Sequence, residues 1–194
     1  MPQSQTPFQA DPDQVYQPAE DSFLLFKVAK QEIRPGDRVL EIGVGSGFVS
    51  VGLLSSCCLL VATDMNPHAA AVAHKAGVPV VQTDLTAGLC GPFDLILFNP
   101  PYLPTEPAER IDDWLELALD GGPSGRDVIE RFLNQIPGII SPEGRVLLLI
   151  SSLTGPDEVS DLIRKNGFES CTMAEERVEG GEILMILRLT IPCR

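Results

Sequence analysis

Hydrophobic and polar positions along the middle of this chain follow two periods in turn. Short apolar runs are separated by longer segments whose apolar residues recur at helical spacing. This alternation predicts strands and helices in the order of a parallel sheet that is covered on both faces. The predicted strands are Val39–Ile42, Leu59–Thr63, Val78–Gln82, Leu95–Phe98 and Val146–Ile150. The predicted helices are Ser22–Lys30, Phe48–Ser56, Pro67–Ala76, Arg126–Gln135 and Asp157–Lys165.

The two ends of the chain depart from this pattern. Phe168–Met173 and Glu182–Leu189 flank Glu179-Gly180-Gly181 with no room for a helix, which predicts an antiparallel hairpin. The predicted fold is a single α/β domain over residues 16–194. It has a Rossmann-like, seven-stranded, mostly parallel sheet with helices on both faces. Residues 1–15 are rich in Pro, Gln and Asp and are predicted to form a flexible N-terminal arm.

The composition narrows the class of protein. Acidic side chains number 27 against 14 basic ones, and the net charge of −13 disfavours bare nucleic acid as a substrate. Five cysteines, with no C-x-x-C spacing and only two histidines, predict neither a disulfide scaffold nor a metal site. Apolar runs such as Val146–Ile150 are too short to cross a bilayer, and no signal segment opens the chain. A soluble cytoplasmic protein is therefore expected.

A glycine-rich turn follows the first predicted strand and opens a helix. In the segment EIGVGSG, Gly43, Gly45 and Gly47 have the spacing G-x-G-x-G, which lets a ligand approach the backbone at a helix N-terminus. Dinucleotide sites favour G-x-G-x-x-G, and phosphate-binding loops need a G-K-[ST] sequence that is absent here. A tight turn with a purely structural role is the alternative, so the glycines alone do not decide the function.

Carboxylates stand at the ends of three successive predicted strands. Asp64 ends the second strand, where a ribose diol would lie, and Asp84 ends the third, where an adenine amino group would donate to it. Glu41, at the end of the first strand, would face a cationic sulfonium or ammonium group. Together with the glycine turn, these carboxylates favour S-adenosylmethionine over NAD as the cofactor.

The fourth predicted strand runs into the segment LFNPPY. Neither proline can continue a sheet ladder, because neither has a backbone N–H. The Asn99 side-chain oxygen and the Pro100 carbonyl can accept both hydrogens of an NH₂ group, and Tyr102 would stack on a planar amide. These bonds strengthen as the nitrogen becomes positive, so no general base is needed before methyl transfer. The alternative is a strand-end turn with a rim aromatic residue.

Several motifs of the chain resemble those of a known enzyme family. EIGVGSG, TDMNP, TDL and NPPY, in this order and spacing, resemble the class I S-adenosylmethionine-dependent methyltransferases of the HemK type, which methylate a glutamine amide of release factors. VYQPAEDSFLL and GGPSGRDV are similar to the short archaeal and eukaryotic branch of that family. This branch acts on the GGQ glutamine of class 1 translation termination factors. The resemblance covers residues 15–190.

The resemblance implies further cofactor contacts. In the family the PAEDS-like segment folds over the methyl donor, where a phenol ring and carboxylates stabilise a sulfonium and exclude water. The additional cofactor-binding residues implied are Tyr16, Glu20, Ser22, Leu85 and Asn99. The alternative for the PAEDS segment is an ordinary helix N-terminus, where Glu20, Asp21 and Ser22 act as caps and as partners of the helix dipole, with Asp21 or Ser22 as the N-cap.

The resemblance also implies a protein partner. Enzymes of the short branch generally lack a substrate-recognition domain and work with a small zinc-binding activator protein. Val78–Gln82 should be the edge strand of the sheet, preceded by the weakly polar segment Ala69–Ala76. Because an exposed apolar edge needs to be paired or covered, we expect a partner strand to add beside residues 78–82.

The motifs leave more than one substrate open. The acceptors at Asn99 would also serve a nucleobase amino group or a neutral lysine, so a nucleic-acid amino-methyltransferase and a protein lysine methyltransferase are alternatives. The first should show a basic face, which the sequence lacks. A non-catalytic binding module is disfavoured by the intact Asn99 and glycines. The irregular stretch Leu103–Gly125 is long enough to be functional, and Trp114 either lines the substrate groove or is buried under this loop.

Overall fold

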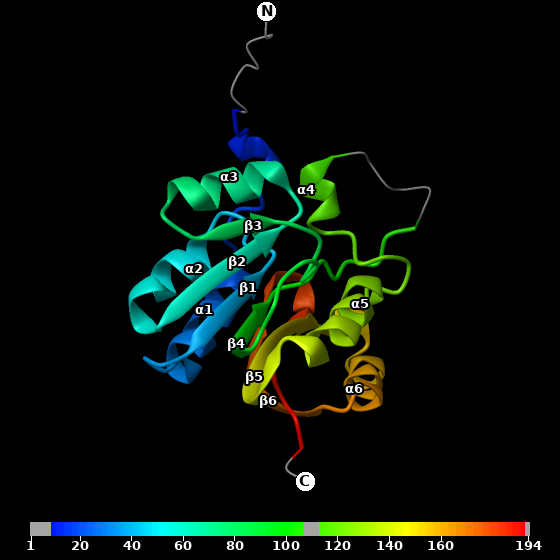
Figure 1. The fold of residues 1–194 in the computed structure, drawn as a ribbon. Helices are drawn as coiled ribbons and strands as arrows, with labels where there is room; N and C mark the ends of the chain where they lie inside the picture. The colour runs from blue at the N-terminus through cyan, green and yellow to red at the C-terminus, as the bar shows by residue number, and fades with distance from the viewer. Residues whose placement is uncertain (1–8, 107–112, 193–194) are drawn as a thin grey trace, which may run out of the picture.

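The computed structural model describes residues 9–106 and 113–192 (Figure 1). The strands are β1 Arg38–Ile42, β2 Leu59–Asp64, β3 Val80–Gln82, β4 Phe93–Phe98, β5 Ile140–Ser151, β6 Glu169–Arg177 and β7 Ile183–Thr190. The α-helices are α1 Glu20–Glu32, α2 Phe48–Leu53, α3 Pro67–Lys75, α4 Trp114–Leu117, α5 Asp127–Gln135 and α6 Pro156–Lys165. Within the described residues the strands form one seven-stranded sheet, in the order β3-β2-β1-β4-β5-β7-β6. β7 is antiparallel to both of its neighbours and the other pairs are parallel, which confirms the predicted fold class.

Helices cover both faces of the sheet, and successive strand residues contribute to two different hydrophobic cores (Figure 1). On one face, Leu40 and Ile96 pack in a core that includes the buried residues of α5 and α6. On the other face, Val39 and Leu95 pack with residues of α1, α2 and α3. The two-residue period of a strand produces this alternation, and burial on both faces explains why the sequence shows continuous apolar runs.

The register of the central strands determines where a site can form. Ile42 at the end of β1 pairs with Thr63 of β2 on one side and with Phe98 of β4 on the other. These three parallel strands therefore end at the same level. The glycine turn that begins at Gly43 and the NPPY segment that begins at Asn99 are thus brought to one edge of the sheet.

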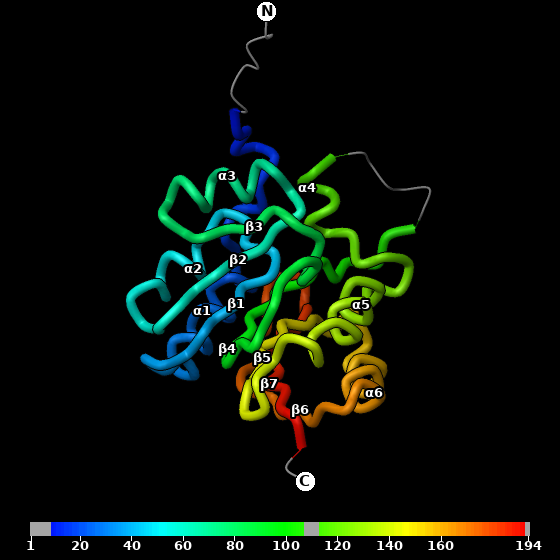
Figure 2. Tube along the Cα trace, in the orientation of Figure 1, coloured from blue at the N-terminus to red at the C-terminus, as the bar shows by residue number. Residues whose placement is uncertain are grey.

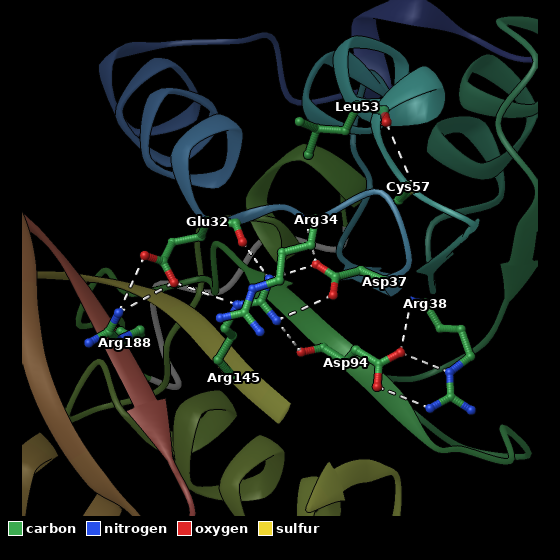
Figure 3. A network of polar contacts seen from close by, with 9 residues as sticks. All are labelled: Glu32, Arg34, Asp37, Arg38, Leu53, Cys57, Asp94, Arg145 and Arg188. Atoms are coloured by element: carbon green, nitrogen blue, oxygen red, sulfur yellow. Dashed lines mark hydrogen bonds and ion pairs between the residues drawn. The ribbon is translucent and has the colours of Figure 1, made fainter. Parts of the chain in front are cut away.

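The edge of the sheet opposite the NPPY segment holds a network of charged groups with a buried pair, Arg145 and Asp37, at its centre (Figure 3). Arg145 of β5 is 4% exposed, and its guanidinium donates to the Asp37 carboxylate at 2.6 Å. The same guanidinium lies 3.6 Å from the carboxylate of Glu32, the last residue of α1. Arg188 of β7 approaches Glu32 at 3.3 Å. The network thus connects α1 to two strands of the sheet, far from the NPPY segment.

Some element boundaries differ from those that the sequence predicts. β3 begins at Val80 because Val78, which is 1% exposed, packs in the core beside α3 instead of extending the edge strand. The N-cap of α1 is Ala19, and Asp21 and Ser22 lie inside the first turn, so the predicted cap is wrong. β5 and β6 are longer than predicted, because residues outside the apolar runs, such as Ile140 and Arg145 of β5 and Arg177 of β6, also pair with neighbouring strands.

The first described residues lie beside α3 (Figure 2). They include the 3-10 helix η1, Pro12–Gln14, which contacts α3. The Asn66 side chain, at the start of α3, donates a 2.7 Å hydrogen bond to the Gln14 carbonyl. These contacts are not predicted by the sequence. The flexible arm remains a prediction for residues 1–8, which lie outside the described part of the chain.

The segment after NPPY is attached to the region of α4 by backbone hydrogen bonds. Leu103 donates to the Leu119 carbonyl at 3.0 Å, and Gly121 donates back to the Leu103 carbonyl at 2.9 Å. Gly125 has a φ of +70°, and a Cβ there would lie 2.5 Å from the Tyr102 carbonyl oxygen. Glycine is therefore required where the loop packs against NPPY. The stretch predicted to be irregular contains the short helix α4 in its described part.

Candidate active site

A cavity lies at the carboxyl edge of the sheet, against the glycine turn and the loops that follow β2, β3 and β4. Most of the site residues predicted from the sequence line it. These are Tyr16, Ser22, Glu41, Gly43, Gly45, Asp64, Asp84, Leu85, Asn99, Pro100 and Tyr102. The cavity therefore joins the predicted cofactor residues to the NPPY segment.

The glycine turn and the β2 carboxylate are connected by hydrogen bonds. Gly43 and Gly45 have φ angles of +70° and +51°, which glycine adopts without strain. The Gly45 amide donates to one oxygen of Asp64 at 2.9 Å, and the Asn66 amide donates to the other at 2.9 Å. Burial raises the pKa of Asp64, and these backbone bonds partly offset that effect. The carboxylate is thus fixed at the cavity wall with lone pairs left to accept from a ligand.

Two of the predicted cofactor residues lie elsewhere. Gly47 is the N-cap of α2, with a φ of +84°, and a Cβ there would lie 3.2 Å from the Cβ of Ala73 in α3. Its role in the structure is the turn and the close approach of two helices. Glu20 is the exposed first residue of α1 and does not line the cavity.

Glu41 is a buried carboxyl group at the floor of the cavity. It is 5% exposed and accepts a short hydrogen bond from the Ser50 hydroxyl of α2. Burial raises the pKa of Glu41 to about 8, the Ser50 hydrogen bonds lower it partly, and the charge of Asp64 adds to the increase. At neutral pH this group is therefore held largely in the protonated form.

The substitution Glu41→Gln is expected to change how stability depends on pH. In the native state Glu41 keeps its proton up to a pKa of about 8, whereas an unfolded chain releases it near its ordinary pKa of about 4.3. Folding therefore takes up a proton between these values, and the free energy of unfolding falls as the pH rises. Glutamine does not titrate, so the free energy of unfolding of E41Q lacks this fall. The difference in free energy of unfolding, E41Q minus wild type, should therefore rise by more than about 1 kcal/mol from pH 5 to pH 8.

Urea unfolding at pH 5, 6.5 and 8 measures this difference. The substitution Glu143→Gln, at an exposed position of β5, makes the same chemical change away from the cavity and is the control. It should show no comparable gain. A difference between E41Q and wild type that stays constant over this pH range would contradict the assignment of a raised pKa to Glu41.

Asp84, the third of the carboxylates predicted at strand ends, is paired with an arginine. Asp84 forms a short ion pair with Arg131 of α5, and about half of each side chain is exposed. Both residues line the cavity. The next residue, Leu85, has a φ of +50°, a left-handed conformation that is uncommon for a side chain of this kind. Such a conformation persists only where its surroundings enforce it, and it often marks a ligand site.

Among the described residues, the Asn99 side chain has a hydrogen-bond partner on its nitrogen but not on its oxygen. Its Nδ2 donates to Asp21 of α1 at 2.9 Å. Its Oδ1 is buried, and no described residue donates to it. Thr63 Oγ1, also in the cavity wall, is buried and unpartnered in the same way. Buried polar atoms normally have partners, so these two are the groups that a ligand would satisfy.

Both tyrosines of the chain line the cavity. Burial raises the pKa of Tyr16, and its hydroxyl, which donates to Asp21 at 2.9 Å, is held further in the neutral form by that carboxylate. Burial likewise raises the pKa of Tyr102, with the charge of Asp21 as the next cause. Trp114 of α4 is half-buried and lines the cavity as well, which favours the groove position over burial under the loop.

Metal sites and membrane-spanning helices are not found among the described residues. These residues contain no group of His, Cys, Asp and Glu side chains arranged to hold a metal ion. The described cysteines Cys57, Cys58, Cys90 and Cys171 are free. No helix in residues 9–106 or 113–192 is long and apolar enough to cross a membrane.

Comparison with known proteins identifies the family, although no family model matches the chain. A Methanocaldococcus jannaschii protein assigned as a protein N5-glutamine methyltransferase is 38% identical over 180 residues, which cover 89% of this chain and 90% of that protein. The human methyltransferase HEMK2 is 37% identical over 192 residues, which cover 91% of this chain and 89% of that protein. The chain belongs to the HemK-type protein N5-glutamine methyltransferases.

A solved structure shows a similar fold. The Mtq2–Trm112 complex of E. cuniculi, described as responsible for the methylation of the translation termination factor eRF1, contains a chain with a TM-score of 0.77. That chain is 26% identical to this one, and the match covers 92% of this chain and 99% of that chain. The similarity extends over nearly the whole of both chains, so the two chains share one fold over the matched length.

Three residues that line the cavity are missed by the sequence analysis. Thr63 and Arg131 carry no signal there, because a threonine at a strand end and an arginine on a helix are common. Asp21 is assigned at most a capping role. A signal for it exists, since Asp21, Leu24 and Val28 have the spacing of one helix face, and that face is buried. An acid on an apolar stripe indicates a buried partner.

Proposed function

We propose that this HemK-type chain transfers a methyl group from S-adenosylmethionine to the side-chain amide nitrogen of glutamine in the GGQ motif of a class 1 translation termination factor. It would act in the cytoplasm, where translation terminates. The observation that carries the proposal is the buried Asn99 oxygen, to which no described residue donates, in the same cavity as the glycine turn. The names of the similar proteins support it, since two of them denote glutamine or termination-factor methylation.

The cavity residues fit S-adenosylmethionine. Asp64, held by two backbone amides, would accept from the ribose hydroxyls, and Asp84 would accept from the adenine amino group beside Leu85. Glu41 would ionise next to the cationic end of the cofactor, and Gly43 would let the ligand approach the backbone. The buried Thr63 hydroxyl, which lacks a described partner, supplies one more polar contact.

Three residues would hold the substrate amide. When bound, S-adenosylmethionine supplies the methyl group: the nitrogen lone pair forms the new N–C bond, the C–S electron pair stays on sulfur, and one nitrogen proton is lost to water. Asn99 Oδ1 and the Pro100 carbonyl would accept the two N–H hydrogens and point the lone pair away from themselves. Both bonds strengthen as the nitrogen becomes positive. The Tyr102 ring would pack on the amide plane and favour that charge.

The tyrosines would take part as neutral groups. Burial and the Asp21 carboxylate raise the pKa values of Tyr16 and Tyr102, so neither phenol is a base at physiological pH. A carboxamide NH₂ is also far too weak an acid for an ordinary base to deprotonate. Orientation and charge stabilisation by Asn99 and Pro100 therefore take the place of general-base catalysis.

Mass spectrometry of a termination factor tests the proposal. The factor, with its GGQ motif, is incubated with the chain, an activator protein and isotope-labelled S-adenosylmethionine, and the labelled residue is located by fragmentation. Label on the GGQ glutamine is expected. Label on lysine alone, or only on added DNA or RNA, would overturn the assignment, because both alternatives share the Asn99 acceptor but differ in the nitrogen that is methylated.

We propose further that a small zinc-binding activator protein adds a strand at β3. β3 is an edge of the sheet, and its Val81 side chain is 40% exposed. The E. cuniculi complex pairs a similar chain with Trm112. Ala62 donates to the Pro79 carbonyl and Thr83 donates to the Asp64 carbonyl. The backbone N–H and C=O groups of odd-numbered residues in this segment thus point toward β2. The backbone N–H of Gln82 points the other way, where an added strand can accept from it.

The substitution Gln82→Pro should weaken binding of the activator by at least about tenfold. Proline removes the outward N–H, whereas no bond to β2 is lost, and an edge strand tolerates proline. Gln82→Ala removes the same side chain but keeps the N–H, so it should bind like wild type. Isothermal titration of each purified chain with the activator protein compares them. Equal affinities for Q82P and Q82A would exclude strand addition through this residue.

A further inference from the structure

Asp21 is a buried carboxylate that four hydrogen bonds fix in place. It is 4% exposed. Its Oδ1 accepts from the Ser22 amide at 2.5 Å and from the Ser22 hydroxyl at 3.1 Å. Its Oδ2 accepts from the Tyr16 hydroxyl at 2.9 Å and from Asn99 Nδ2 at 2.9 Å. The carboxylate therefore connects the start of α1 to a residue 78 positions later in the chain, at the end of β4.

This contact determines which end of the Asn99 amide is free. A carboxylate only accepts hydrogen bonds, so it can hold the NH₂ group of Asn99 but not the oxygen. The reverse orientation would place two acceptors against each other and a donor where the substrate NH₂ must bind. In the orientation observed, Oδ1 is buried without a described donor. The acceptor that methyl transfer to an amide requires is thus left available because Asp21 occupies the nitrogen.

The fold by itself does not explain why Asp21 is buried. α1 is capped at Ala19, and the Asp21 side chain is not the cap. Aspartate on the buried stripe of a helix is unfavourable unless the charge is well satisfied. The donors that satisfy it include Tyr16 and Asn99, both of which line the cavity. The burial of this charge therefore serves the cavity.

We propose that Asp21 is a positioning residue for methyl transfer: its carboxylate holds the Asn99 side-chain amide by the NH₂ group and leaves the amide oxygen to accept from the substrate nitrogen. The inference rests on the proposed amide methylation. Asp21 and Ser22 of the PAEDS segment thus orient Asn99 of the NPPY segment, in addition to any contact that they make with the cofactor.

The substitution Asp21→Asn reverses this arrangement. The Ser22 N–H cannot rotate, so it keeps an oxygen at the Oδ1 position, and the new NH₂ group faces Asn99. Asn99 then turns its oxygen toward residue 21 and presents its NH₂ to the substrate. We expect kcat on the GGQ glutamine to fall by about 10²-fold, and the affinity for S-adenosylhomocysteine, measured by calorimetry, to change less than about threefold. Asp157→Asn, at the equivalent second position of α6, is the control.

A swapped pair separates positioning from a structural role. The single variant N99D places two carboxylates side by side and should also be slow. In the double variant D21N/N99D, the new amide at position 21 donates its NH₂ to one oxygen of the new carboxylate at position 99. The other oxygen of that carboxylate is again an acceptor for the substrate. We expect this variant to recover at least tenfold in kcat over D21N. All assays use the full chain with the activator protein present.

The outcomes distinguish this inference from the proposed function. Wild-type chain that labels no glutamine overturns the proposed function. If wild type labels glutamine but D21N retains the kcat of D157N, or the swapped pair is no faster than D21N, the positioning role is wrong. Hydrogen exchange of the Asn99 side-chain NH₂, followed by NMR, does not depend on the substrate. It should be at least tenfold faster in Asp21→Ala than in wild type, and equal rates would overturn the inference.

Discussion

Replacing Asn99 with alanine should lower the rate of glutamine methylation by about 10²- to 10³-fold, the range seen when one group that stabilises a transition state is removed. The side chain supplies the one buried amide oxygen of the cavity wall that no described residue satisfies. Without it, the Pro100 carbonyl alone would hold the substrate NH₂, and the nitrogen lone pair would be free to turn away from the methyl group. Single-turnover kinetics with labelled cofactor measure the chemical step directly.

The same variant should remain folded. Asp21 loses one of its donors in N99A but keeps those from Tyr16 and Ser22, so its charge is still satisfied. Asn134→Ala, at an exposed position of α5, is the control for removal of an asparagine side chain. If N99A keeps at least a tenth of the wild-type single-turnover rate, methylation of the substrate amide nitrogen does not depend on the Asn99 acceptor.

The positions that the sequence predicts well are those where a local pattern and the fold agree. The strand that ends at Ile42 and the glycine turn after it are read correctly, because an apolar run and G-x-G spacing leave few alternatives. The NPPY segment lies where predicted for the same reason. Gly47 belongs to the same motif but packs against α3, because spacing alone does not distinguish a glycine that faces a ligand from one that faces a helix.

The contacts that the sequence does not predict are those between distant segments. Asp21 and Asn99 are joined across 78 positions of the sequence, and Asp84 pairs with Arg131 at the wall of the cavity. The helical spacing of Asp21 indicates a buried partner but does not say which residue it is, and no local pattern specifies the second pair. Which polar residues become partners depends on which strand ends lie side by side. That in turn depends on the strand order of the sheet, which no local pattern reveals.

Replacing Arg145 with methionine should cost about 3–5 kcal/mol of the free energy of unfolding, the range measured when one partner of a buried ion pair is removed. Arg145 is 5% exposed in its side chain and Asp37 is 6% exposed, and they are joined at 2.6 Å (Figure 3). Methionine fills much of the volume but leaves the Asp37 carboxylate without its cation. Urea unfolding at pH 7 measures the loss. Arg164→Met, in the exposed pair with Asp161, should cost less than about 1 kcal/mol.

The double variant R145M/D37N identifies the source of this cost. If the loss comes from the orphaned charge, neutral asparagine at position 37 removes it, and the double variant should be more stable than R145M. Asp37 also accepts from the Arg34 amide at 2.8 Å, which an asparagine oxygen can still do. R145M within about 1 kcal/mol of wild type, or a double variant less stable than R145M, would mean that the network stabilises the fold mainly through side-chain packing. Because this network lies at the edge of the sheet opposite the cavity, methylation at temperatures well below unfolding should be the same in all of these variants.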